Sequence, residues 1–156
     1  FAALLHMTVH SLTKSAIFFT VGHAAQKAGS QRIDDIRGLL ALNPTIGWGL
    51  MLGSLAILGL PPFGVFASEF LILTTAMKEQ PWATPILLGA LGIAFAAIFG
   101  RVQSMVLGHP AGRRLPHQPA LLPVFAHLAI VLLLGLYIPP YLADWYRAAA
   151  GMIVGN

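Results

Sequence analysis

The sequence predicts an all-α fold, a polytopic membrane helix bundle of about four transmembrane helices, one of them discontinuous at Pro61-Pro62. The first observation behind this prediction is composition: 57% of the 156 residues are hydrophobic and only 9% are charged, whereas soluble domains carry about 25% charged residues. The mean hydropathy of +0.78 agrees with a bilayer setting. The second observation is that the apolar residues fall into separate segments of roughly membrane-crossing length. We therefore expect a single membrane domain over residues 1–156.

Four such segments occupy approximately residues 1–25, 43–77, 82–107 and 120–142. The first begins inside an apolar helical pattern without a cap or a signal peptide, which favours the C-terminal part of a longer polypeptide. The second is longer than one crossing requires and is interrupted near its middle. The third and fourth each hold roughly the 20 apolar residues that one crossing needs.

The interruption in the second segment is the third observation. Pro61 and Pro62 remove backbone donors and clash with the preceding turn. The flanking Gly59 and Gly64 favour an unwound loop over a simple kink. Freed backbone groups are costly in hydrocarbon, so a break at membrane depth predicts a functional, water-lined position.

Charge decides whether the second segment is one broken crossing or a two-pass hairpin. The loops 26–42 and 108–119 are both basic, and a single broken crossing puts them on the same face. The positive-inside rule then favours both loops in the cytoplasm and the C-terminus outside. Basic residues between apolar segments, without interleaved aromatics, indicate topology and argue against a nucleic-acid partner. The basic residues concerned are Lys27, Arg32, Arg37, Arg113 and Arg114.

Titratable residues line one side of the first segment. His6, His10 and Lys14 are spaced four residues apart, so successive side chains drift only about 40° around a helix axis. Neutral imidazoles have one donor and one acceptor nitrogen and can pass protons by way of water. The alternative is a set of polar residues that face a partner helix. A zinc site is disfavoured because Met7 stands where a zinc-protease motif needs Glu, and no third ligand is evident.

Glu69 lies about one turn after the break, among apolar residues. Burial and the positive end of the second half-helix act on its protonation in opposite senses, which predicts a group able to change charge at working pH. The alternative is a permanent ion pair with Lys14 or with a lysine outside this sequence. An acidic residue at membrane depth favours function.

Other polar residues are weaker candidates. His23 sits at the expected cytoplasmic exit of the first helix, Arg101 near the end of the third, and His127 within the fourth. Each is a secondary candidate for the proton path, with interfacial snorkelling or packing as the alternative. The aromatic residues around Pro139-Pro140 predict an interfacial belt; they are Tyr137, Tyr141, Trp145 and Tyr146.

Three stretches carry a resemblance to a known family: HMTVHSLTKSAIFFTVGHAAQ, LGLPPFGVFASEFLIL and LGLYIPPYLADWYRAAAG. They resemble the antiporter-like proton-translocating subunits shared by complex I, Mrp-type cation/proton antiporters and membrane-bound hydrogenases, and are most similar to the hydrogenase-4 or formate hydrogenlyase group. That family has fourteen core helices in two inverted repeats, each with one discontinuous helix. This chain would then supply the last four helices. The family's ionisable residue on the broken helix falls on Glu69, and its histidine and lysine positions on the preceding helix fall on His6, His10 and Lys14.

The resemblance implies proton translocation driven by a redox reaction elsewhere in a multisubunit complex of a bacterial or archaeal cytoplasmic membrane. The expected partners are other membrane subunits and a peripheral redox module. Iron–sulfur, nickel–iron or quinone sites are expected only in those partners, and this chain is expected to hold no cofactor and no metal. With no cysteine, the sequence lacks thiolate sites for a cluster. The alternatives are an Mrp-like sodium/proton antiporter subunit and a structural membrane anchor for a hydrogenase.

Overall fold

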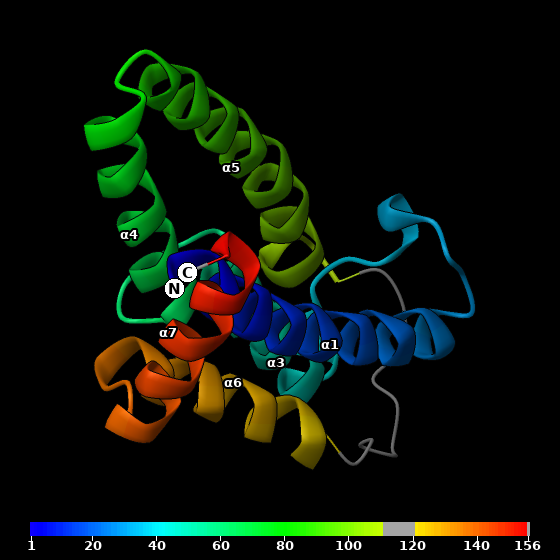
Figure 1. Cartoon of the computed structure of the whole chain (residues 1–156). Coiled ribbons are helices and arrows are strands. Elements are labelled where there is room, and N and C mark those ends of the chain that lie inside the picture. The colour runs from blue at the N-terminus through cyan, green and yellow to red at the C-terminus, as the bar shows by residue number, and fades with distance from the viewer. Residues whose placement is uncertain (111–120, 156) are drawn as a thin grey trace.

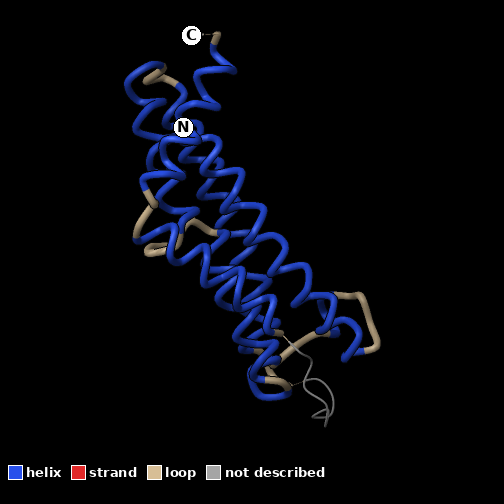
Figure 2. Tube along the Cα trace, turned by 60° about the horizontal axis from the view of Figure 1, so that its bottom comes forward, coloured by secondary structure: helices blue, strands red, loops and turns tan. Residues whose placement is uncertain are grey.

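The structure, a computed structural model, describes residues 1–110 and 121–155, and every regular element within them is helical. This confirms the all-α prediction for those residues. Figure 1 shows the helix α1 (Ala2–Ala28) crossing the middle of the molecule, where it contacts α3 (Pro44–Ile57), α4 (Gly64–Glu79), α6 (Leu122–Leu136) and α7 (Pro140–Val154). The short elements η1 (Ile33–Asp35) and α2 (Leu39–Leu42) and the long helix α5 (Ala83–Leu107) complete the order. Most helices pack side by side along a common direction (Figure 2).

The central helix α1 buries one face against its neighbours. Its buried residues recur at helical spacing, and they are Leu5, Val9, Thr13, Ala16, Thr20 and Ala24. The two threonine hydroxyls each donate to a carbonyl of their own helix at 2.7 Å, so no buried donor is left open there. The helix ends at Gly29, whose φ of 64° suits a glycine and whose amide donates to the Ala25 carbonyl.

The helix break in the second segment forms as its sequence predicts. Asn43 caps α3 by accepting from the Ile46 amide, with Pro44 as the first helical residue. Helix α3 ends at Ile57, the chain turns through Gly59 with a φ of 66°, and α4 begins at Gly64. The non-helical stretch between the two half-helices therefore covers residues 58–63 and includes Pro61-Pro62, as expected.

The final segment differs from the expectation of one run over 120–142. Helix α6 ends at Leu136, and α7 starts at Pro140 after a bend of 84°. Pro139 and Pro140 explain the difference, because proline stops a helix and then suits the first turn of the next. Of the four aromatic residues expected in the interfacial belt, Tyr146 is only 2% exposed and donates to Thr8 Oγ1 at 2.6 Å, while the belt itself stays a prediction.

The loops after α1 and after α5 meet at one end of the molecule. A Cβ at Gly38 would lie 2.8 Å from the Gly108 carbonyl oxygen, and one at Gly108 would lie 3.6 Å from the Arg37 Cβ. Helix α5 runs back along α4 and α3 to reach this point. The arrangement agrees with one broken crossing rather than a hairpin. Arg113 and Arg114 lie outside the described residues.

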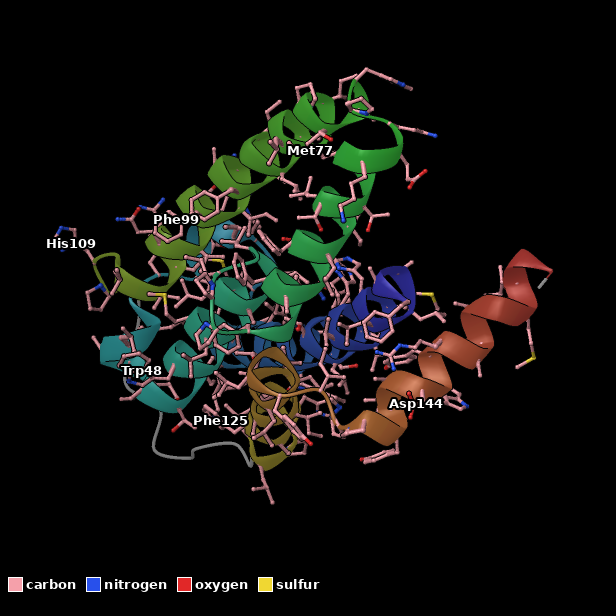
Figure 3. The ribbon with its side chains drawn as sticks, turned by 60° about the vertical axis from the view of Figure 1, so that its left-hand side comes forward. Trp48, Met77, Phe99, His109, Phe125 and Asp144 are labelled. Carbon is pink, nitrogen blue, oxygen red and sulfur yellow. The ribbon has the colours of Figure 1, made fainter. Side chains whose placement is uncertain are left out.

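Helices α4 and α5 project from the rest of the bundle and are joined at the far end (Figure 1). In Figure 3, Met77 marks that end and Phe99 lies further along α5. Helix α5 is mostly exposed within this chain and has a mean hydropathy of 2.0. Of the described helices, α5 is the one that is long and apolar enough to cross a membrane by itself. A second span is found if α6 and α7 together count as one bent span. Four crossings therefore remain a prediction.

Candidate functional site

The break between α3 and α4 is enclosed by two other helices. A Cβ at Gly64 would lie 2.8 Å from Val9 Cγ1 of α1 and 3.0 Å from the Val131 carbonyl oxygen of α6. A Cβ at Gly135 of α6 would overlap the Pro62 carbonyl oxygen. The backbone of α6 therefore lies directly on the unwound residues. Packing, not solvent, fixes where the second half-helix begins.

Glu69 lies one and a half turns into α4 and points back at the break. A Cβ at Gly59 would overlap the Glu69 Oε2 atom, so the carboxylate occupies the space that a side chain there would need. Glu69 is half-buried, and the ion pairs found among the described residues join Arg37 to Asp34 and Arg147 to Asp144. The predicted alternative of an ion pair with Lys14 is therefore absent from residues 1–110 and 121–155.

Two hollows meet at the Glu69 side chain. One of about 320 Å³ lies between the break and α5, and it is lined by Gly59, Glu69 and Gly92 together with apolar side chains. The other, of about 160 Å³, is lined by both Glu69 and His6. Either volume has room for several water molecules. The structure thus brings His6 and Glu69, 63 positions apart in the sequence, to one hollow.

His6 and His10 form a pair on α1. Their ring centroids are 5.2 Å apart, and both side chains are half-buried. His6 Nδ1 lies 3.0 Å from Ser68 Oγ of α4, a residue for which the sequence suggested no role. The sequence shows that Ser68 precedes Glu69, but it gives no sign that Ser68 contacts α1.

Lys14 lies on the same side of α1 as His6 and His10 and completes the polar stripe that these three residues form. It is exposed within this chain, and its Nζ atom lies 5.3 Å from the centroid of the Phe18 ring. Lys14 also lines a hollow of about 380 Å³ with the buried Ser54 of α3 and with Arg101 of α5. Within this chain His6, His10 and Glu69 are half-buried and Lys14 is exposed, so a proton path through a chain of buried His, Lys and Glu stays a prediction.

Of the secondary candidates, Arg101 shares a hollow with Lys14. His127 Nδ1 lies 2.6 Å from the Pro123 carbonyl oxygen, so that ring bonds to its own helix. His23 lies near the C-terminal end of α1 and lines none of the hollows that hold His6, Glu69 or Lys14. Within the described residues, no three His, Asp or Glu side chains lie close enough to hold a metal ion.

Comparison with known proteins identifies the family. The profile of the family described as "NADH:quinone oxidoreductase/Mrp antiporter, TM" matches residues 1–96, which is more than half of the chain. The chain belongs to this family. It is therefore an integral membrane protein of the antiporter-like, complex I-related class, as the sequence predicted.

Relatives within the family span several kinds of complex. The chain is 44% identical over 147 residues to a "Hydrogenase-4 component F homolog" of Methylacidiphilum infernorum (isolate V4), covering 94% of this chain and 31% of the relative. It is 32% identical to "Na(+)/H(+) antiporter subunit A1" of Staphylococcus haemolyticus (strain JCSC1435), covering 85% of this chain and 17% of the relative. The chain thus spans about a third or less of these family members.

The fold is also found in a solved structure, that of the "membrane-bound sulfane sulfur reductase (MBS), an archaeal respiratory membrane complex". The TM-score is 0.82 at 24% identity, with 96% of this chain and 31% of the other chain covered. This likeness shows that the helix arrangement of this chain recurs in that solved structure.

Proposed function

We propose that this chain carries part of a proton path in an antiporter-like subunit, with Glu69 as a group that gains and loses the proton. The observation that carries the proposal is the hollow shared by Glu69 and His6 beside the helix break. A broken helix supplies unpaired backbone groups that hold water. The Glu69 carboxylate can therefore exchange a proton with this water or with His6 across the shared hollow. His10 and Lys14 extend the path along α1.

The driving reaction belongs to other subunits in this proposal. The likeness to a hydrogenase-4 component favours a redox-driven complex with further membrane subunits and a peripheral redox module. Iron–sulfur, nickel–iron or quinone sites would lie in those partners, and this chain would contribute no cofactor. We place it in the cytoplasmic membrane of a bacterium or archaeon with its C-terminus outside, from the positions of the basic loops.

Sodium/proton exchange is the second candidate, favoured by the likeness to a subunit named as a Na⁺/H⁺ antiporter. Proton transport coupled to a redox reaction proceeds without sodium, whereas sodium/proton exchange either uses a sodium gradient or builds one. Measuring proton movement in vesicles with and without sodium separates the two.

The test of Glu69 uses the Glu69→Gln variant of the full-length subunit within its complex. Glutamine keeps the shape and hydrogen bonding of the side chain but cannot ionise, so proton translocation per redox turnover should fall about tenfold or more. Lysine at the same position should do less harm, because it can still bind and release a proton. The matched control is Glu79→Gln, an exposed carboxylate at the end of the same helix, which should pump normally.

Normal pumping by an assembled Glu69→Gln complex would remove Glu69 from the mechanism and favour the structural-anchor alternative.

A further inference from the structure

Ser68 joins α4 to α1 through one oxygen atom. Its side chain is fully buried, its hydroxyl donates to the Val65 carbonyl at 2.8 Å, and the same oxygen lies 3.0 Å from His6 Nδ1. A serine hydroxyl carries a single hydrogen, and a carbonyl oxygen can only accept. With Ser68 as the donor to the Val65 carbonyl, the Ser68 oxygen faces His6 as an acceptor.

This arrangement determines which nitrogen of His6 carries hydrogen. If Nδ1 lacked a proton, two lone pairs would face each other across 3.0 Å. While the Ser68 hydroxyl donates to Val65, the contact is satisfied when Nδ1–H donates to Ser68 Oγ. In a neutral histidine one ring nitrogen is protonated, and the hydrogen bond at one nitrogen sets the state of the other. Neutral His6 then has a bare Nε2.

We propose that Ser68 is a positioning residue that keeps Nδ1 of His6 protonated, so that Nε2 is the nitrogen that takes up and releases the transported proton. The inference rests on the proposed function for the step that it describes. The ring of His6 meets the hollow shared with Glu69 and lies 5.2 Å, centroid to centroid, from the ring of His10. The partners for Nε2 are therefore water or titratable groups of the path.

The chemical consequence is that His6 takes up and releases the proton at the same nitrogen, Nε2, and does not relay it through the ring from one nitrogen to the other. A proton arriving at Nε2 forms an N–H bond with that lone pair and gives an imidazolium with both nitrogens protonated. The Nδ1–H bond to Ser68 persists and strengthens, because hydrogen bonds from a charged donor are stronger. Release from Nε2 restores the starting tautomer. Exit through Nδ1 is blocked, because a relay through Ser68 would have to pass the hydroxyl proton to the Val65 carbonyl oxygen, which accepts a hydrogen bond but does not take up a proton.

The chain offers a matched control for Ser68. Thr13 of α1 is equally buried, and its hydroxyl donates to the Val9 carbonyl of its own helix at 2.7 Å. Both side chains therefore bond back to their helix, but only Ser68 also meets a histidine in the described contacts. Removing each hydroxyl separates the bond to His6 from the general effect of losing a buried hydroxyl.

The first experiment compares Ser68→Ala with Thr13→Val in the full-length subunit within its complex, reconstituted in vesicles. Ser68→Ala should lower the protons translocated per redox turnover about fivefold, the change expected for loss of one hydrogen bond of ordinary strength. Thr13→Val should pump as the wild type does. Ser68→Thr keeps the hydroxyl and should restore pumping relative to Ser68→Ala. Equal pumping by Ser68→Ala and the wild type, with assembly verified, would overturn the proposal.

The second experiment takes its decisive reading from the wild-type complex. The complex with ¹⁵N-labelled histidine is studied by solid-state NMR, and the signals of His6 are identified by their loss in His6→Asn. Neutral His6 should show a protonated Nδ1 and a bare Nε2, and this pattern should change in Ser68→Ala. A wild-type His6 with the proton on Nε2 would overturn the assignment even if Glu69→Gln abolishes pumping. Normal pumping by Glu69→Gln, with Nδ1 of His6 protonated, would instead end the proposed function and leave the tautomer standing.

Discussion

At the scale of single residues, the site depends on two neighbours of α4 that face different partners. Ser68 reaches α1, while Glu69 reaches back to the break at Gly59. Consecutive residues on a helix point about 100° apart, so one turn of α4 serves both contacts. Any displacement of this half-helix changes the surroundings of His6 and of Glu69 together.

Gly59→Ala tests the space that the Glu69 carboxylate occupies. Alanine at a φ of 66° is strained by about 1–3 kcal/mol, and its methyl group would overlap the Glu69 carboxylate. Proton translocation per turnover, measured in vesicles, should therefore fall several-fold while the redox reaction continues. The control is Gly92→Ala, which lines the same hollow but would meet nothing within 4 Å. If both variants pump alike, the position of the carboxylate against Gly59 does not matter for transport.

At the scale of elements, the helix break was predictable from the sequence, but the packing of α1 and α6 around the break was not. Proline and glycine act on their own backbone, so Pro61, Pro62 and Gly59 indicate a break without any knowledge of neighbours. The contacts of Ser68 with His6 and of Gly135 with Pro62 join residues more than 60 positions apart. No local pattern specifies such pairs. They require the packing of α1, α4 and α6 to be known.

The bend before α7 was missed for a different reason. Pro139 and Pro140 give the local signal for a helix stop, but the apolar run continues on both sides of them and the aromatic residues there are typical of a membrane interface. Pro140 begins a new helix, which turns Tyr146 inward against α1. The sequence thus contained the local signal for the bend, while the direction of the turn depended on where Thr8 lies.

Gly135→Ala tests whether α6 clamps the break. The added methyl group would overlap the Pro62 carbonyl oxygen and lie close to the Gly64 amide. Overpacking of this kind typically costs about 1–3 kcal/mol, so the thermal unfolding midpoint of the purified full-length subunit should fall. Gly89→Ala on α5, where a Cβ would meet nothing within 4 Å, is the control and should not lower the midpoint. An unchanged midpoint for Gly135→Ala would mean that α6 can move away without cost.

At the scale of the whole molecule, the contact between the two loops links chain direction to membrane sidedness. Gly38 and Gly108 lie against each other's loops at one end, while the α4–α5 connection lies at the other. A chain that crosses once through α3 and α4 and returns through α5 gives this arrangement. The positive-inside rule then assigns the loop end to the cytoplasm.

Cysteine labelling tests this topology, and the chain has no cysteine of its own to interfere. Gln31→Cys and His109→Cys, both at exposed positions of the loop end, should react with a membrane-impermeant reagent only from the cytoplasmic side. Gln80→Cys, exposed between α4 and α5, should react only from outside. Labelling of the first two from opposite faces would mean that the α3–α4 segment is a hairpin.

The central position of α1 has a consequence for biosynthesis. This 27-residue helix is about 40 Å long, enough to cross a bilayer, yet it is not among the described helices that are apolar enough to count as a membrane span. It is synthesised before α3, α4 and α6, which later cover it. The side of α1 that carries its histidines and lysine therefore lacks these three neighbours when the helix first reaches the membrane. Its final packing has to follow the insertion of the later helices, which makes the folding of this region a joint event rather than a helix-by-helix one.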